Sequence, residues 1–349
     1  MSGLALVAAA LAFDPGFTPG YEPLELGPGA PTSDDCGSCH ALEQAEWSES
    51  RHHASWTNPG MQVAYIYEQQ RFCVTCHAPL PRQIAEIRAN RDWYRSQDPR
   101  DGVLDAPAKQ PEPHAAEGIG CPTCHWRDGA VRTTRRTGPG AAPHALTYTP
   151  ELATGDFCAT CHDFDVPLHI EGVLTPTGVP MQATSAEWAA WRNEGGRATC
   201  QDCHMPRGSH RFRGAHDVAL LRRSVRVRSE VRASGLVLTL RTHRVGHALP
   251  SGDIFRQLVV EVSGGDGWRE VARFGRELTF DLDPWTGDRT PRVVRDNALH
   301  PGEPRTVHVP GAAGDAWRVR YLYVSEPALA ARLGDEHVAV VLAHSGPAE

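Results

Sequence analysis

All ten cysteines in this chain of 349 residues belong to one repeated pattern. Two cysteines are separated by two residues, and a histidine follows at once. The five copies are Cys36, Cys39 and His40; Cys73, Cys76 and His77; Cys121, Cys124 and His125; Cys158, Cys161 and His162; and Cys200, Cys203 and His204. Because no cysteine is left over, the five copies call for one common explanation.

The pattern predicts covalent attachment of five haem c groups. In such a motif both thiols add to the vinyl groups of one porphyrin, and the adjacent histidine lies under the iron. Structural zinc explains the pattern less well, because each ion needs four ligands and five pairs do not divide into sets of four thiolates. A disulfide within each pair would join residues that are already close in the chain, so it would constrain the fold very little.

The beginning of the chain indicates export, which covalent haem attachment requires. The segment MSGLALVAAALAF is typical of the apolar core of a signal peptide, with Ala10, Leu11 and Ala12 as the cleavage site. It is too short for a membrane span, which needs about 20 apolar residues. We therefore expect a periplasmic or extracellular protein without a membrane span. The formal net charge of -7, to which haem propionates would add, argues against a nucleic acid partner.

A signal-like and Pro/Gly-rich leader spans residues 1–34, and two parts that differ in their residue pattern follow it. Residues 35–217 contain all five motifs, with short helices expected at 41–53, 61–72, 81–95 and 184–195. Thr184 and Glu187 have the spacing of a capping box. This part has few aliphatic residues, so we predict a mainly α cytochrome domain with little regular structure, in which haem forms the core.

Residues 218–349 contain no cysteine and alternate between apolar and polar residues, as strands do. Seven such segments are bounded by Gly, Pro and Asp, and they span 224–233, 235–245, 254–264, 268–280, 305–311, 316–324 and 337–346. We therefore predict an all-β sandwich domain of roughly 100 residues or slightly more.

Thirteen histidines remain for the opposite faces of the five irons, more than are needed. His300, His308, His337 and His344 lie in β segments and are expected to be ordinary. The predicted distal ligands lie beside the motifs or in the turn GHALPSGD, and they are His52 or its neighbour His53, His114, His144, His210, His216 and His247, with His169 as a further candidate. For His247 a plain turn residue is an equally open interpretation.

The flanks of the motifs resemble those of a known family. CGSCHALEQAEWSESRHHASW is similar to the first haem segment of the multihaem c-type cytochromes related to the tetrahaem electron carrier that serves hydroxylamine oxidoreductase. GIGCPTCH, FCATCHDF, MQATSAEWAAW before CQDCHMP, and GHALPSGD are similar to other segments of that wider group. The resemblance implies that His52, five residues after Trp47, ligates a second haem. A fifth motif and the β part depart from the tetrahaem pattern.

These features predict a pentahaem c-type cytochrome that passes electrons between redox partner proteins through mostly bis-histidine haems. We favour this electron carrier over an enzyme. The rival is a multihaem reductase or oxidase of small nitrogen or sulfur compounds with one open-faced haem. Pentahaem nitrite reductases hold their catalytic haem through a motif that ends in lysine, whereas all five motifs here end in histidine. A homo-oligomer or a subunit of an extracellular haem filament also remains open.

Overall fold

The computed structural model describes residues 24, 26, 29–68, 71–97, 110–138, 140–170, 173–264, 267–284, 289–312, 314–331, 333 and 335–345. The proposed signal peptide lies outside these residues. None of the helices in the described part is long and apolar enough to cross a membrane. At the end of the predicted leader, Leu24 and Leu26 are buried against Leu80.

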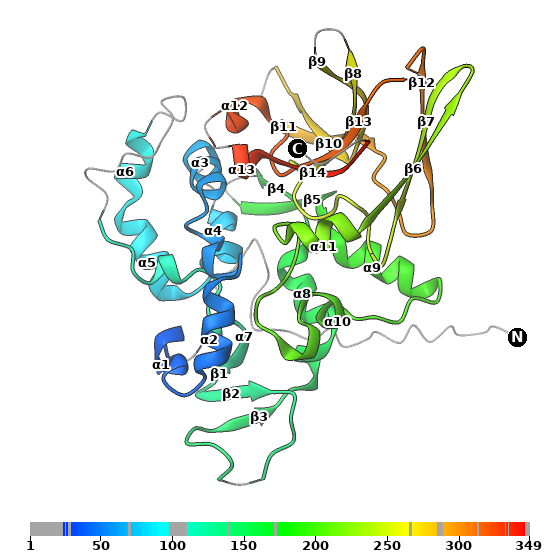
Figure 1. Cartoon of the computed structure of the whole chain (residues 1–349). Coiled ribbons are helices and arrows are strands. Elements are labelled where there is room, and N and C mark those ends of the chain that lie inside the picture. Colours follow the sequence, from blue (N-terminus) through cyan, green and yellow to red (C-terminus); the bar gives the residue numbers. More distant parts are fainter. Residues whose placement is uncertain are drawn as a thin grey trace, which may run out of the picture.

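Short helices dominate the first part of the chain (Figure 1). They are α1 (Ser33–Gly37), α2 (Ala41–Ser48), α3 (Pro59–Glu68), α4 (Arg71–His77), α5 (Pro81–Ala89), α6 (Arg91–Ser96), α7 (Cys121–His125), α8 (Gly155–His162), α9 (Thr184–Asn193) and α10 (Cys200–His204). Single turns of 3₁₀ helix are η1 (His53–Ser55), η2 (Ala115–Glu117), η3 (Pro150–Ala153) and η4 (Pro206–Gly208). The four predicted helical segments are therefore helical, two of them as pairs of shorter helices.

This first part also contains β-structure that the sequence interpretation missed. Strands β1 (Trp126–Arg127), β2 (Ala130–Thr133) and β3 (Leu146–Tyr148) form a small sheet. Strands β4 (Asp163–Ile170) and β5 (Val173–Ala183) form a long antiparallel hairpin. Prolines at 167, 176 and 180 obscured the strand pattern, and an isolated hairpin tolerates them because its outer edges need no ladder partner. The description as mainly α with little regular structure is therefore not borne out in this part.

After α11 (Val218–Arg223), strands predominate. One antiparallel sheet contains β12 (Arg305–Pro310), β7 (Gly235–Thr242) and β6 (Val225–Arg232), in that order. The other contains β14 (Ala339–His344), β13 (Trp317–Leu322), β8 (Gln257–Gly264) and β9 (Gly267–Phe274). Both sheets contribute to one hydrophobic core, which includes Leu238 of β7, Leu258 of β8 and Val319 of β13. Helices α12 (Pro327–Ala330) and α13 (Asp335–Val338) precede β14.

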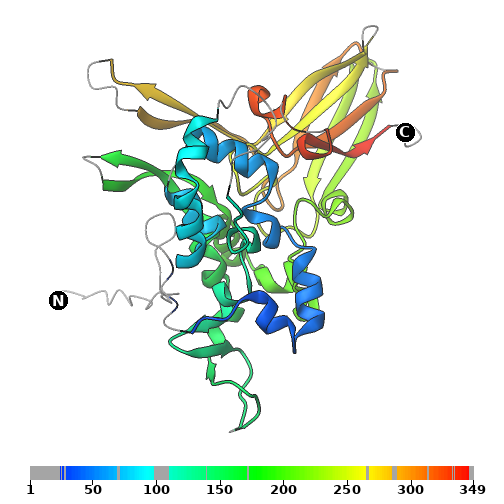
Figure 2. The same ribbon diagram turned by 90° about the vertical axis from the view of Figure 1, so that its left-hand side faces the viewer.

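One predicted strand segment, 268–280, divides into strands of two different sheets. The division falls at Gly275, whose φ of +146° ends β9. The following strand β10 (Arg276–Leu282) pairs with β11 (Arg289–Asp296), which was not predicted. The hairpins β10–β11 and β4–β5 contact each other and project on the same side of the molecule (Figure 2).

The two parts differ sharply in how they fill their interiors. Nineteen buried hydrophobic residues form the core between the two large sheets. Within the described residues of 116–217, which contain three of the five motifs, the buried hydrophobic residues are only Val166 and Ala183. Close packing is the rule in protein interiors. The stretch around these motifs therefore lacks the side-chain core that an ordinary domain of its size would have.

Candidate haem-binding site

Four of the five motif histidines end a short helix, namely α4, α7, α8 and α10. The cysteines precede them on the same turn, so each motif presents two thiols and one imidazole together. The first motif differs, because His40 lies between α1 and α2. All ten cysteines are free; eight are partly buried and two are exposed. Free cysteines in folded proteins are usually among the most buried residues, so the exposure of these thiols is unusual.

Thiols of different motifs lie next to each other. The side chains of Cys36 and Cys121 are within hydrogen-bonding reach, and the same holds for Cys76 with Cys161 and for Cys158 with Cys200. The hydrogen bond from its partner lowers the pKa of Cys121 to about 7, and likewise that of Cys200 to about 7. Burial raises the pKa of Cys124, which lies near Cys161, to about 12. The third motif therefore adjoins the first and the fourth, and the fourth also adjoins the second and the fifth.

Three motif histidines each face a second histidine from elsewhere in the chain. His162 and His52 have ring centroids 6.3 Å apart. His125 and His210 are 6.2 Å apart, and His204 and His247 are also 6.2 Å apart with ring planes inclined by only 17°. The structure thus brings together predicted proximal and predicted distal residues in three separate pairs.

The separation of these rings fits a metal ion between them. An imidazole nitrogen binds a metal at about 2 Å, and each ring centroid lies about 1.1 to 1.2 Å behind its nitrogen, so two rings on opposite sides of one ion have centroids about 6.3 Å apart. Direct stacking would bring flat rings closer, as His216 and Tyr323 are at 4.3 Å. The residues present therefore fit an iron atom held between two imidazoles.

Hydrogen bonds select which ring nitrogen is available. The Nδ1 atoms of His77 and His125 lie 3.0 Å from the carbonyl oxygens of Ser55 and Arg132, and Nδ1 of His247 lies 2.7 Å from that of Ala248. Nδ1 of His204 contacts the carbonyl of Arg213 in the same way. Because a carbonyl oxygen only accepts, each Nδ1 must be the donor, and each Nε2 keeps its lone pair for a metal.

Loss of solvent favours the neutral form of five of these imidazoles. It lowers the pKa of His52 to about 3, and it lowers the pKa values of His162 and His247 to about 4. Burial also lowers the pKa values of His77 and His125. A neutral imidazole is the form that binds metal, so ligation requires no proton release at neutral pH.

His210 is positioned by α2. Its backbone N–H donates to Glu46 Oε2 at 2.8 Å, and the neighbouring Arg211 forms an ion pair with Glu49, which directly follows that helix. Trp47 anchors α2 in turn, because its indole N–H donates to the carbonyl of Ile119 at 2.7 Å. Side chains of α2 therefore carry the histidine that faces His125.

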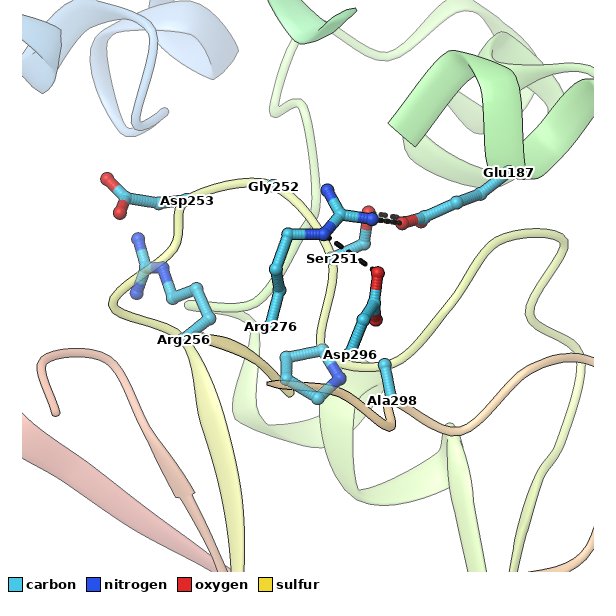
Figure 3. Close-up of a pocket in the computed structure, with 9 residues that line it drawn as sticks. Glu187, Ser251, Gly252, Asp253, Arg256, Arg276, Asp296 and Ala298 are labelled. Atoms are coloured by element: carbon cyan, nitrogen blue, oxygen red, sulfur yellow. Dashed lines mark hydrogen bonds and ion pairs between the residues drawn. The ribbon is translucent and has the colours of Figure 1, made fainter. Parts of the chain in front are cut away.

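His247 is positioned by α9 from the other part of the chain. Glu187 Oε2 accepts from Ser251 Oγ at 2.6 Å and from the N–H of Ala248 at 3.1 Å, and Glu187 also lies 3.5 Å from Arg276 (Figure 3). Trp191 lies against Gly246 so closely that a Cβ atom there would be 2.7 Å from its ring. Contacts on both sides of His247 therefore fix the turn, which contains a cis Leu249–Pro250 peptide bond.

These contacts correct the expected capping box. The side chain of Thr184 does not cap α9; its hydroxyl instead lies 2.8 Å from that of Ser251. Asp163 Oδ2 accepts from the N–H of Ala186 and satisfies the start of the helix. Thr184 and Glu187 thus bind the turn that contains Ser251. Their spacing along one helix could not predict a contact with this distant segment.

The other predicted histidines lie elsewhere. The ring of His53 packs on Trp47 with centroids 4.4 Å apart. His114 Nε2 lies 4.0 Å from Glu86, and His144 is exposed with Nδ1 3.4 Å from the carbonyl of Ala145. The side chain of His169 lies outside the described residues. Ligand roles for His114 and His144 stay predictions.

His216 packs against groups that the sequence interpretation did not single out. Its ring stacks on Tyr323 and lies 3.2 Å from the guanidinium of Arg51. Burial, followed by the charges of Arg256 and Arg51, lowers the pKa of His216 to about 3. A ligand role for His216 also stays a prediction.

Comparison with known proteins identifies a solved structure of similar fold. No family model matches the chain, and no curated protein does. The crystal structure of a penta-heme cytochrome c552 from Thermochromatium tepidum matches with a TM-score of 0.61, over 90% of this chain and 98% of that one. The chain has the fold of a multihaem c-type cytochrome. With 20% of residues identical, the similarity is one of fold, and it does not single out the tetrahaem branch that the motif flanks resemble.

Proposed function

We propose that this protein is an exported pentahaem c-type cytochrome that passes electrons between redox partner proteins. The three imidazole pairs with centroids 6.2 to 6.3 Å apart support the proposal most strongly. When bound, haem supplies one-electron chemistry at each iron, and axial imidazoles tune its potential. The chain's own contribution is to bring two imidazoles to opposite sides of three of the proposed metal positions and to set the distances between attachment points.

In this proposal ten cysteines attach five haem groups, and His40, His77, His125, His162 and His204 are the proximal ligands. His162, His125 and His204 pair with His52, His210 and His247, respectively. Axial positions filled on both sides leave no face for a substrate, which suits electron transfer. Residues 35–217 would form the haem-binding domain, and residues 218–349 would form a β domain that lends His247 to the fifth haem.

The thiol contacts support a branched relay. The first, third and fourth motifs adjoin in series through Cys36 with Cys121 and Cys124 with Cys161. The fourth motif also adjoins the second through Cys161 with Cys76, and the fifth through Cys158 with Cys200. We therefore propose that the fourth motif is the branch point of the electron path, with three termini at the first, second and fifth motifs.

Two measurements on the purified protein test the proposal. Its intact mass should exceed that of the mature polypeptide by five haem groups, and a mass with four or fewer in fully matured protein would contradict it. Carbon monoxide should alter the reduced spectrum of at most two haems, because three are expected to be bis-histidine. Binding to three or more haems would refute the ligand assignment.

A second candidate function is an enzyme with an open-faced haem at the second motif. His77 is oriented as a ligand by Ser55, yet within the described part of the chain no histidine ring is paired with it as His52 is with His162. Steady turnover of nitrite, hydroxylamine or sulfite with artificial electron carriers would favour this function. Reduction and reoxidation without turnover would favour the electron carrier.

A further inference from the structure

A cluster of cationic and aromatic side chains lies where the two parts of the chain meet. Nη2 of Arg51 lies 3.2 and 3.3 Å from the two ring nitrogens of His216. His216 stacks on Tyr323, whose ring centroid is 5.5 Å from the guanidinium carbon of Arg256. Tyr323 is buried, Arg256 and His216 are half-buried, and Arg51 is exposed. We call these four residues the arginine cluster; it opens to solvent at Arg51.

The two guanidinium groups are not neutralised within the described part of the chain. Neither Arg51 nor Arg256 lies within ion-pair distance of a described carboxylate, and the buried Nη1 of Arg256 has no hydrogen-bond partner. Asp253 lies on the same turn as Arg256, but its Oδ1 accepts from the N–H of Phe255 (Figure 3). By contrast, Arg276 and Arg318 form ion pairs with Glu187 and Glu261.

An unpaired, partly buried cation is costly, and proteins ordinarily pair it. The guanidinium group presents its donors in a planar fork that matches two oxygens of a carboxylate or a small oxyanion. Arg51 contacts His216, Arg256 lies near Tyr323, and these two rings stack on each other. The hydroxyl of Tyr323 donates to the carbonyl of Ala215 at 3.1 Å. The cluster is therefore built from both parts of the chain and presents two guanidinium groups without a described carboxylate partner.

We propose that the arginine cluster binds an anionic group with two or more oxygens. Two sources share this chemistry: a free oxyanion that enters at Arg51, or the propionate of a neighbouring haem. The propionate source rests on the proposed haem content. It is favoured by the position of Arg51, which directly precedes the proposed iron ligand His52. The free-anion source does not depend on electron transfer. Neither source was apparent from the motifs, since the four residues are far apart in the sequence.

The test compares Arg256→Gln with Arg256→Lys, which keeps the charge, and with Arg228→Gln, whose arginine is 80% exposed on β6. The intact mass of each holoprotein reports its haem content and so tests the proposed function separately. Binding of sodium nitrite to the oxidised protein is measured by calorimetry at low ionic strength. The midpoint potentials of all haems are measured by potentiometric titration.

For a free anion we expect saturable nitrite binding that weakens about tenfold or more in Arg256→Gln, as for loss of a charge-assisted hydrogen bond. Arg256→Lys should restore part of the nitrite binding, and Arg228→Gln should leave nitrite binding unchanged.

For a propionate we expect no nitrite binding but a more negative potential of one haem in Arg256→Gln, because a nearby positive charge favours the reduced form. If nitrite binding and potentials in Arg256→Gln both match those of Arg228→Gln, the proposal is wrong. If Arg256→Gln loses haem, the comparison of Arg256→Lys with the unmodified protein decides by the same two measurements.

Discussion

A single hydrogen bond at Nδ1 orients four of the proposed ligand histidines. In His77, His125, His204 and His247 that nitrogen donates to a backbone carbonyl, which orients the ring and leaves Nε2 as the metal-binding atom. The acceptors are main-chain atoms, so they move only if the backbone moves. The orientation of these four imidazoles is thereby determined by the local fold and needs no additional side chain.

Replacing a distal histidine should open one iron. We expect His52→Ala, His210→Ala and His247→Ala each to convert one haem from low spin to high spin, because the sixth ligand is lost. Electron paramagnetic resonance of the oxidised protein and carbon monoxide binding to the reduced protein measure the change. His308→Ala, at an exposed position on β12, is the control. A spectrum of His247→Ala that matches the control would identify His247 as an ordinary turn residue.

At the scale of elements, α9 positions a turn in the other part of the chain, which its sequence does not predict. The helix lies in the first part of the chain, but its Glu187 and Trp191 hold the turn of the β part that contains His247. The side chain of Glu187 is only 11% exposed, and burial raises its pKa. Losing its acceptor oxygens would leave the N–H of Ala248 without a partner and would leave the hydroxyl of Ser251 with only that of Thr184.

We therefore expect Glu187→Ala to loosen the turn. The variant should lose about 1 to 3 kcal/mol of stability, the usual cost of leaving buried polar groups unpaired. It should also raise the high-spin fraction of the fifth haem, and Glu187→Gln, which keeps one acceptor, should do so less. Glu194→Ala, at the exposed end of the same helix, is the matched control. A stability loss with unchanged spin state and potential would mean that Glu187 stabilises the fold without positioning His247.

Helix α11 joins the two parts and depends on Asp217. The Oδ1 atom of Asp217 accepts from the N–H of Leu220 at 2.9 Å and caps the helix, and Oδ2 pairs with Arg213. The hydrogen bond from Arg213 lowers the pKa of Asp217 below its value of 3.8. The ionised form is therefore favoured in the folded protein. Its contribution to stability is present above about pH 4 and is lost as the pH falls through the lowered pKa.

Asp217→Asn keeps a capping oxygen and removes the charge. Compared with the unmodified protein, we expect it to lower the melting temperature by a few degrees at pH 7. The difference should shrink as the pH falls below 4 and through the lowered pKa, where Asp217 becomes protonated in the folded protein as well. Thermal unfolding followed by circular dichroism from pH 7 to pH 3 measures it, with the exposed Asp315→Asn as control. A difference that persists undiminished at pH 3 would show that the charge is not its cause.

At the scale of the whole molecule, two kinds of interior lie side by side. The β part is closed by its own core, which includes Leu240, Val260 and Tyr321. The part around the third, fourth and fifth motifs has little apolar packing and half-exposed thiols instead. The large apolar faces of covalently bound haem would supply the missing core, and binding energy would then be folding energy.

Protein made without haem attachment tests this division. We expect limited proteolysis of such protein to degrade residues 35–217 and to leave a fragment that begins near α11, since only the β part has a side-chain core. The haem-loaded protein should resist the same treatment throughout. Mass spectrometry of the fragments identifies their ends. Equal resistance of both parts without haem would show that the first part folds without its cofactor.

The sequence by itself predicted the attachment chemistry and the positions of most helices and strands. The five motifs are local patterns, because the thiols and the imidazole of each motif belong to one turn of chain. Alternation identified most strands of the β part, but not β11, for the same reason, since it depends on neighbours two residues apart. It failed for β4 and β5, where prolines interrupt the pattern, and at Gly275, where one segment serves two sheets.

Only the tertiary structure decided the pairings. His162 and His52 are separated by more than a hundred residues, and thirteen candidates gave no means of choosing a partner for each motif histidine. Contacts between distant segments likewise determine the spatial order of the motifs. The same is true of the hydrogen bonds from the turn with His247 to Glu187, and of the arginine cluster. A ligand needs only the right atom at the right place, and the chain can supply that atom from any segment that the fold brings near.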